Sequence, residues 1–70
     1  MNIKISDITL EKIRCSKNGM EIADKLLEIT TRPNNEYNRG VLHGFLFTLT
    51  MQDIITGDEG IAILEQIRRS

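Results

Sequence analysis

The residues best suited to chemistry in this chain are its one histidine, His43, and its one cysteine, Cys15. Nucleophilic catalysis needs a base within hydrogen-bond reach of the nucleophile, usually with a carboxylate behind that base. His43 lies in the most apolar stretch of the sequence, so we expect a buried or half-buried packing histidine. Cys15 is expected on a helix as a small apolar packing residue. These residues predict no enzymatic activity.

The carboxylates do not form a recognisable site either. Asp53, Asp58 and Glu59 cluster near Gly57 and Gly60. They lack the alternating oxygen ligands and the final bidentate glutamate of a calcium loop. They also place acidic side chains where a phosphate-binding loop needs bare backbone N–H groups. We therefore predict that they cap a helix, and we expect no cofactor and no metal.

Two glycines in a helical pattern are the most distinctive spacing. Gly40 and Gly44 are four residues apart, and Thr48 continues the same row, so on a helix they leave room for another backbone to approach closely. Each interior glycine destabilises a helix by about 0.8–1 kcal/mol relative to alanine, which calls for a compensating contact. That contact is packing inside the monomer, a seam between two copies, or a groove for a partner or small ligand.

A polar cluster comes just before the glycine row. Tyr37, Asn38 and Arg39 form either a solvated first turn or a surface for an anionic ligand or a partner. Together with the glycine row they give the candidate partner-binding or dimer interface: Tyr37, Arg39, Gly40, Val41, His43, Gly44 and Thr48.

Three or four helices would position these residues, since the segment after Asn18 is either a new helix or a restart of the first one after a kink. Ser6 predicts an N-cap for a helix over about 6–16, after Ile3 and Ile5, which form a short strand or an extended arm. Asn18 and Glu21 have capping-box spacing, and the helix that they begin must end by Thr31 or Arg32, because Pro33 disfavours helical dihedrals in the residue before it. The remaining two helices are predicted over 36–53, with Asn34 or Asn35 as its cap, and over 57–69.

The helix over 36–53 is expected at the centre of the fold. Tyr37, Val41, Phe45 and Leu49 recur every four residues and, with their apolar neighbours, make a surface too wide for packing on one side. A strand across the segment 45–51 is the alternative, since Phe47, Leu49 and Met51 alternate there with Thr48 and Thr50, and aromatic and β-branched residues are enriched. The unbroken four-residue series favours the helix.

The last helix has the sharpest start signal. Thr56 and Glu59 form a capping box, and Ile61, Leu64 and Ile67 or Arg68 are predicted to share its apolar face, widened by Ala62 and Ile63. The short link before it predicts an antiparallel hairpin. The expected fold is all-α, a single small domain over 1–70 with three or four short helices, a C-terminal helical hairpin and a short extended N-terminal arm.

Composition explains why such a chain would need a partner. It has 70 residues, 40% of them hydrophobic and 27% charged, with a net charge of -1. A core of this size seldom supplies more than about 3–5 kcal/mol of net stability, and one cysteine cannot make an internal disulfide. We therefore predict a homodimer or docking onto another protein. No targeting signal or apolar run of about 20 residues is present, so no membrane association and a cytoplasmic location are expected.

One short segment resembles a DNA-binding motif. Residues 22–26, Ile-Ala-Asp-Lys-Leu, are similar to the first helix of helix-turn-helix repressors. Leu27 stands where that family has a turn glycine, and Pro33 falls where its recognition helix should continue. The overall charge gives no basic footprint, so a small dimeric DNA-binding regulator is the second hypothesis, with Arg32 and Arg39 as the phosphate contacts.

A second resemblance covers about half the chain. The segments 37–44 and 55–59 resemble the helical hairpins of small accessory proteins encoded by bacteriophages and other mobile elements, in which an arginine-glycine helix is followed by a capped restart. This resemblance implies a non-enzymatic protein that binds and blocks a host component. The leading hypothesis is therefore a protein-interaction module of the phage or prophage inhibitor or regulator type.

Overall fold

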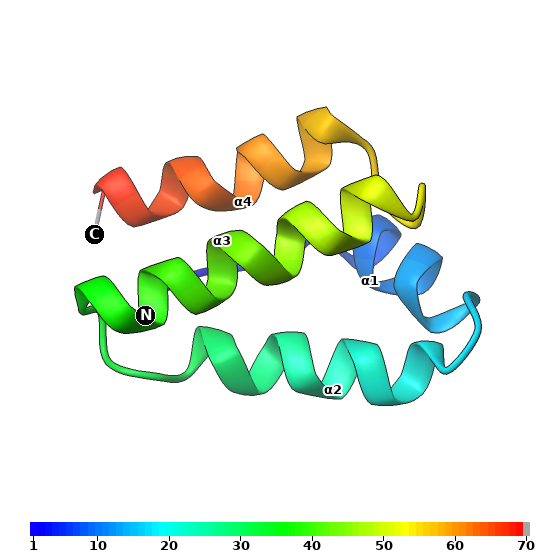
Figure 1. Cartoon of the computed structure of the whole chain (residues 1–70), viewed down its shortest axis with the longest axis horizontal. Coiled ribbons are helices and arrows are strands. Elements are labelled where there is room, and N and C mark those ends of the chain that lie inside the picture. The colour runs from blue at the N-terminus through cyan, green and yellow to red at the C-terminus, as the bar shows by residue number, and fades with distance from the viewer. Residues whose placement is uncertain (70) are drawn as a thin grey trace.

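The computed structural model describes residues 1–69, which form an N-terminal arm and four helices (Figure 1). The helices are α1 (Asp7–Arg14), α2 (Gly19–Thr30), α3 (Glu36–Met51) and α4 (Gly57–Arg69). No strand occurs within residues 1–69. The predicted all-α fold is therefore confirmed, and the segment 45–51 is helical.

Helix α3 occupies the middle of the structure. It lies between α2 and α4 and contacts both, while α1 packs against α2 (Figure 1). Helices α3 and α4 run in opposite directions, which confirms the C-terminal hairpin. The expectation that α3 is central is thus correct, because two neighbouring helices cover two of its sides.

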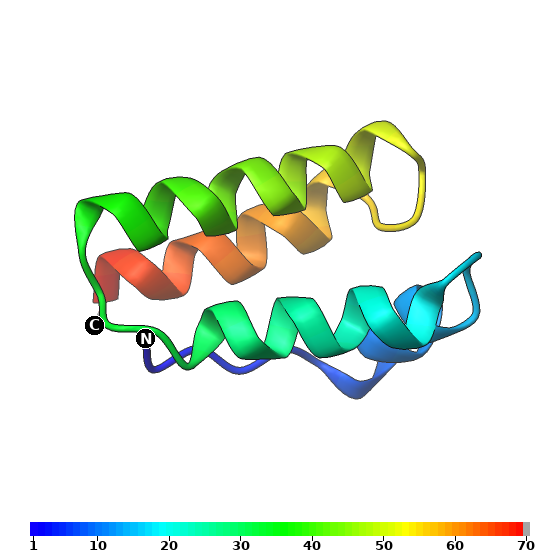
Figure 2. The same cartoon turned by 60° about the horizontal axis from the view of Figure 1, so that its bottom comes forward.

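The first residues form an extended arm that runs beneath α2 toward α1 (Figure 2). The backbone N–H of Lys4 donates to Gln66 Oε1 at 2.8 Å, and Gln66 Nε2 donates to the Lys4 carbonyl at 2.7 Å. The amino group of Met1 donates to the carbonyl of Arg32, while Ile3 and Ile5 pack against the core. The arm therefore joins α4 to the end of α2 without forming a strand.

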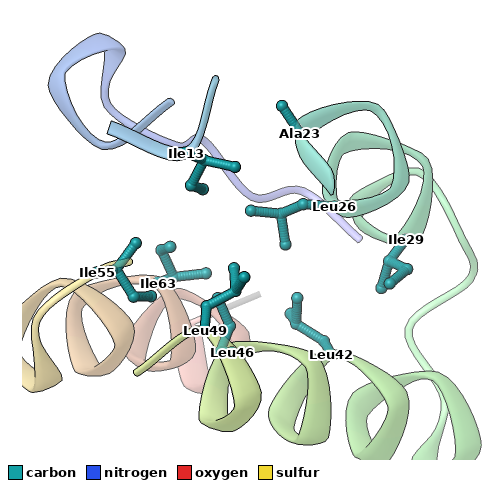
Figure 3. Close-up of a cluster of buried hydrophobic side chains, with 9 residues drawn as sticks. All are labelled: Ile13, Ala23, Leu26, Ile29, Leu42, Leu46, Leu49, Ile55 and Ile63. Atoms are coloured by element: carbon teal, nitrogen blue, oxygen red, sulfur yellow. The ribbon is translucent and has the colours of Figure 1, made fainter. Parts of the chain in front are cut away.

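The core is built from one side of each helix (Figure 3). Side chains from α1, α2, α3, α4 and the last loop converge in one cluster, made of Ile13, Ala23, Leu26, Ile29, Leu42, Leu46, Leu49, Ile55 and Ile63. Burial of such side chains contributes about 25 cal/mol per Å² of apolar area. This cluster is what holds α3 in place and decides which of its sides remains outside.

Three of the predicted helix starts are confirmed by their hydrogen bonds. Ser6 Oγ accepts from the Thr9 N–H at 3.2 Å, and Asn35 Oδ1 accepts from the Asn38 N–H at 2.8 Å. Thr56 and Glu59 form the full capping box: the Glu59 N–H donates to Thr56 Oγ1 at 3.1 Å, and the Thr56 N–H donates to Glu59 Oε1 at 2.8 Å. These starts are local, and the sequence predicts them correctly.

Helix α2 begins directly after Asn18, as predicted, but the side-chain cap predicted there is wrong. Asn18 has left-handed dihedrals, φ 58° and ψ 25°, and its side chain makes no cap hydrogen bond. The next residue, Gly19, is so close to the end of α1 that a Cβ there would lie 2.1 Å from the carbonyl oxygen of Ile13. The tight α1–α2 turn therefore selects Asn18 for its tolerance of positive φ, and the spacing to Glu21 is incidental.

The predicted apolar faces of α3 and α4 are correct only in part: Leu49 is buried, and Leu64 and Ile67 pack against the core, but both observed faces are rotated from the predicted ones. In α3 the buried positions are Asn38, Leu42, Leu46 and Leu49, whereas Tyr37 is exposed. In α4 Ile63 is buried and Ile61 is exposed. Helix α3 also ends at Met51, two residues before Asp53, which adopts φ 58° in the turn. The positions of the neighbouring helices select the buried side, and spacing alone does not contain them.

Candidate functional site

The outer face of α3 is the side of that helix that the rest of the chain leaves exposed. It consists of Tyr37, Gly40, Gly44, Phe47, Thr48 and Met51. Tyr37, Phe47 and Met51 have 76%, 61% and 69% of their surface exposed. Between Gly40 and Gln52 the sequence has no aspartate, glutamate, lysine or arginine. The outer face is therefore an uncharged apolar surface with three large side chains.

Both helix glycines lie open on this face. A Cβ added at Gly40 or at Gly44 would meet nothing within 4 Å. The hydroxyl of Thr48 donates to the carbonyl of Gly44 at 3.0 Å, so it too is engaged within its own helix. The alternative that the glycines serve close packing inside the monomer is therefore wrong, because α2 and α4 approach α3 on its other sides.

Arg39 and His43 lie beside the outer face, on the flank of α3 that borders α4. They line a hollow of about 400 Å³ together with Leu64, Ile67 and Arg68. His43 is exposed, so the expectation of a buried or half-buried histidine is wrong. Its position in an apolar stretch was misleading, because that stretch wraps around the whole helix and includes the flank that faces the hollow.

Val41 falls on the opposite flank. It is half-buried and packs against the core. Of the predicted interface residues, four therefore share the outer face, two line the hollow beside α4, and Val41 supports the fold. The structure brings Tyr37, Gly40, Gly44 and Thr48 onto one surface.

Several surface residues next to the predicted ones are missing from the sequence-based set. Phe47 and Met51 extend the outer face toward the end of α3, and Ile61 and Arg68 belong to the hollows along α4. Phe47 and Met51 continue the spacing from His43 in steps of four, a signal that was available. The α4 residues become neighbours only through the packing of the hairpin.

A polar bridge joins α1 to the first turn of α4 on another side of the molecule. Glu59 Oε1 pairs with Lys12 Nζ at 2.7 Å, and Thr9 Oγ1 donates to Glu59 Oε2 at 3.1 Å. Lys12, the backbone N–H of Thr56 and Thr9 lower the pKa of Glu59 to about 2. The spacing of Thr56 and Glu59 predicts the cap but not the link from Glu59 to Lys12, since 47 positions separate these two residues.

The remaining reactive side chains stand apart from one another. Cys15 is exposed, with Sγ 3.6 Å from Glu11 Oε1, so the expectation that it packs inside is wrong. Its helix buries Leu10 and Ile13 instead. Among residues 1–69, no three histidine, cysteine, aspartate or glutamate side chains gather closely enough to hold a metal ion.

The segment that resembles a helix-turn-helix lies in α2. Its Ala23 and Leu26 belong to the core. Arg32, one of the two predicted phosphate contacts, forms two hydrogen bonds to Glu28, at 2.6 and 2.7 Å. This pairing with Arg32 also lowers the pKa of Glu28 to about 2.

Comparisons with known proteins add no relative to these observations: no family model, no curated protein and no solved structure matches the chain. Within the described part of the chain, none of the helices combines the length and the apolar character that crossing a bilayer requires.

Proposed function

We propose that the protein is a non-enzymatic protein-interaction module that forms a homodimer through the outer face of α3. One observation carries the proposal: the central helix of the fold exposes three large apolar side chains and two glycines that its own chain does not cover. Exposed apolar patches of this kind mark interaction sites. Two interior glycines weaken α3 as a monomer, and a close contact on this face would compensate for that.

The arrangement of side chains supports an antiparallel pairing of two copies about Gly44. Tyr37 and Met51 each lie seven positions from Gly44, and Gly40 and Thr48 each lie four positions from it. A two-fold axis at Gly44 would therefore place Tyr37 against Met51 of the second copy, where sulfur and aromatic ring attract each other. No charged side chain occurs between Gly40 and Gln52, so the copies meet without like-charge repulsion.

The proposed biological role is that of an inhibitor or regulator of the phage or prophage type, which acts in the cytoplasm by covering a surface of a host protein. The resemblance of 37–44 and 55–59 to accessory proteins of mobile elements supports this role, and the exposed thiol of Cys15 fits a reducing compartment.

The test is the molar mass in solution, measured by size-exclusion chromatography with light scattering at micromolar concentrations. The wild-type chain is expected at twice its 8.0 kDa mass. Gly44→Leu fills open space in the monomer and improves helix propensity, so it should fold and yet be monomeric. Ala62→Leu makes the same kind of addition at an exposed site on α4 and should remain dimeric.

A wild-type chain that is monomeric throughout this range would overturn the dimer. A Gly44→Leu variant that is as dimeric as the wild type would overturn the assignment to the outer face of α3.

A further inference from the structure

Adjoining hollows lie between α3 and α4, beside the outer face, and together they form what we call the α3–α4 groove. Three hollows make it up, with volumes of about 400, 240 and 190 Å³. His43 and Leu64 line all three of them, so the hollows are parts of one groove. Along α3 the groove extends from Arg39 to Thr50, which corresponds to about 16 Å or three helical turns.

The two ends of this α3–α4 groove differ in character. At one end Arg39 and Arg68 flank a floor of Leu64 and Ile67. At the other end Phe47 and Ile61, both more than half exposed, stand beside Gly57 and Gly60. The groove is thus cationic at one end and apolar at the other.

The two arginines at the cationic end, Arg39 and Arg68, form no ion pair with another side chain of residues 1–68. Among the side chains of residues 1–68 the ion pairs involve Lys12, Lys25 and Arg32 as cations, and Arg39 has a hydrogen bond from Nη1 to Asn34 Oδ1 at 3.1 Å. Glu65 also lines the groove and already takes part in an interaction within the chain. The carboxylate of a ligand could therefore accept charge-assisted hydrogen bonds from two guanidinium groups, whose planar geometry matches that of a carboxylate.

We propose that the α3–α4 groove binds an amphipathic helical segment of a partner protein that carries carboxylates at one end and apolar side chains along the rest. Its carboxylates pair with Arg39 and Arg68, and its apolar side chains, spaced by three or four residues, pack on Leu64 and Ile61. This is the helix-in-groove mode of recognition. The inference names the partner chemistry for the proposed interaction module, and it does not depend on the dimer.

Nucleic acid fits the groove less well. A phosphate backbone repeats its charge along the whole bound length, whereas this groove has cations at one end and an apolar surface over the remainder. A ligand that is anionic at one end only matches both parts.

Binding can be measured by fluorescence anisotropy with labelled, end-blocked peptides of about three helical turns. The probes have leucines spaced by three and four residues and two glutamates at either the first or the last turn; matched peptides carry lysines in place of the glutamates. We expect one glutamate peptide to bind at least about tenfold more tightly than its lysine counterpart.

Variants locate the site. Arg39→Gln with Arg68→Gln should weaken the glutamate peptide by about tenfold or more, and Ile61→Ser should weaken both charge versions of the peptide. Arg14→Gln with Lys17→Gln removes the same charge from exposed positions around the end of α1 and should leave binding unchanged. Circular dichroism of each variant checks that it is folded.

Three results would overturn the proposal: no binding of either glutamate peptide up to millimolar concentration, equal binding of glutamate and lysine peptides, or an unchanged affinity in the Arg39 and Arg68 variant. Tighter binding of a labelled DNA duplex or of dodecanoate would replace the peptide ligand by a phosphate or a lipid one. Because the dimer is measured by mass, its failure and the failure of the groove are separate results.

Discussion

The inner and outer sides of α3 both carry large apolar side chains, but only those of the inner side are buried. The inner side buries three leucines, Leu42, Leu46 and Leu49, whereas the outer face exposes an aromatic pair and a methionine, Tyr37, Phe47 and Met51. Packing of the inner side accounts for the fold, because it meets every other helix in the core (Figure 3). The apolar character of the outer face has no such explanation within one chain, which is why we assign it to binding.

The largest expected effect is on the inner side. Leu46→Ala removes a fully buried side chain and should lower the free energy of unfolding by about 2–5 kcal/mol, enough to remove most of the stability of so small a chain. Phe47→Ala, one position further along, should cost less than about 1 kcal/mol in the monomer. Urea unfolding followed by circular dichroism compares them, and equal losses would erase the distinction between the two sides.

Gly19 and Gly44 also differ in whether the chain packs against them. Gly19→Ala would push a methyl group against the carbonyls of Ile13 and Arg14, and overpacking of this kind costs about 1–3 kcal/mol. Gly44→Ala meets open space and should stabilise the monomer by about 0.5–1 kcal/mol. Thermal unfolding at a concentration where the chain is monomeric measures both, and a loss of stability in Gly44→Ala would show that the outer face is packed after all.

Two glutamates, Glu59 and Glu28, have pKa values lowered to about 2, but only Glu59 pairs with a residue of another helix. Glu59 links α1 to α4 and caps a helix, whereas Glu28 pairs with Arg32 one turn away on the same exposed surface. Glu59→Gln should lower stability at neutral pH by about 1 kcal/mol, and Glu28→Gln should have a much smaller effect. Denaturant titrations at pH 7 compare the two variants.

The pH dependence follows from the direction of the shift. The pKa of Glu59 falls from 4.5 to about 2 on folding, so the unfolded chain binds the proton more tightly. The free energy of unfolding therefore decreases as the pH is lowered. The contribution of Glu59 is complete above pH 4.5 and is lost as the pH drops toward 2. Unfolding between pH 5 and 2 should have a shallower pH slope in Glu59→Gln, and an identical slope would assign the acid sensitivity to other groups.

The parts of the fold that the sequence could predict are the local ones. The caps at Ser6, Asn35 and Thr56 depend on residues three positions apart, and all three form as expected. The cap at Asn18 failed because α1 and α2 approach within van der Waals contact at Gly19, a tertiary constraint. The prediction that Tyr37 lies on the buried side of α3 is wrong for a similar reason. Tyr37 fits the four-residue series, but it lies on the side of α3 that neither α2 nor α4 covers.

The candidate site was predictable as a stretch of α3 but not as a surface. Gly40 and Gly44 are candidates in the sequence because interior glycines destabilise a helix, and both lie on the exposed side of α3. The groove at Arg39 and His43 required the position of Arg68 on α4, which the hairpin brings from 25 residues or more along the chain. Spacing within one helix contains no information about that neighbour.

Contact between Tyr37 and Met51 tests the dimer most directly. These residues are fourteen positions apart, or about 21 Å along α3, so within one chain their side chains cannot touch. In a sample that mixes isotope-labelled and unlabelled chains, isotope-filtered NMR should show cross-peaks between the Met51 methyl group and the Tyr37 ring. A sample with dimeric mass but without those cross-peaks would contradict the antiparallel pairing of the outer faces.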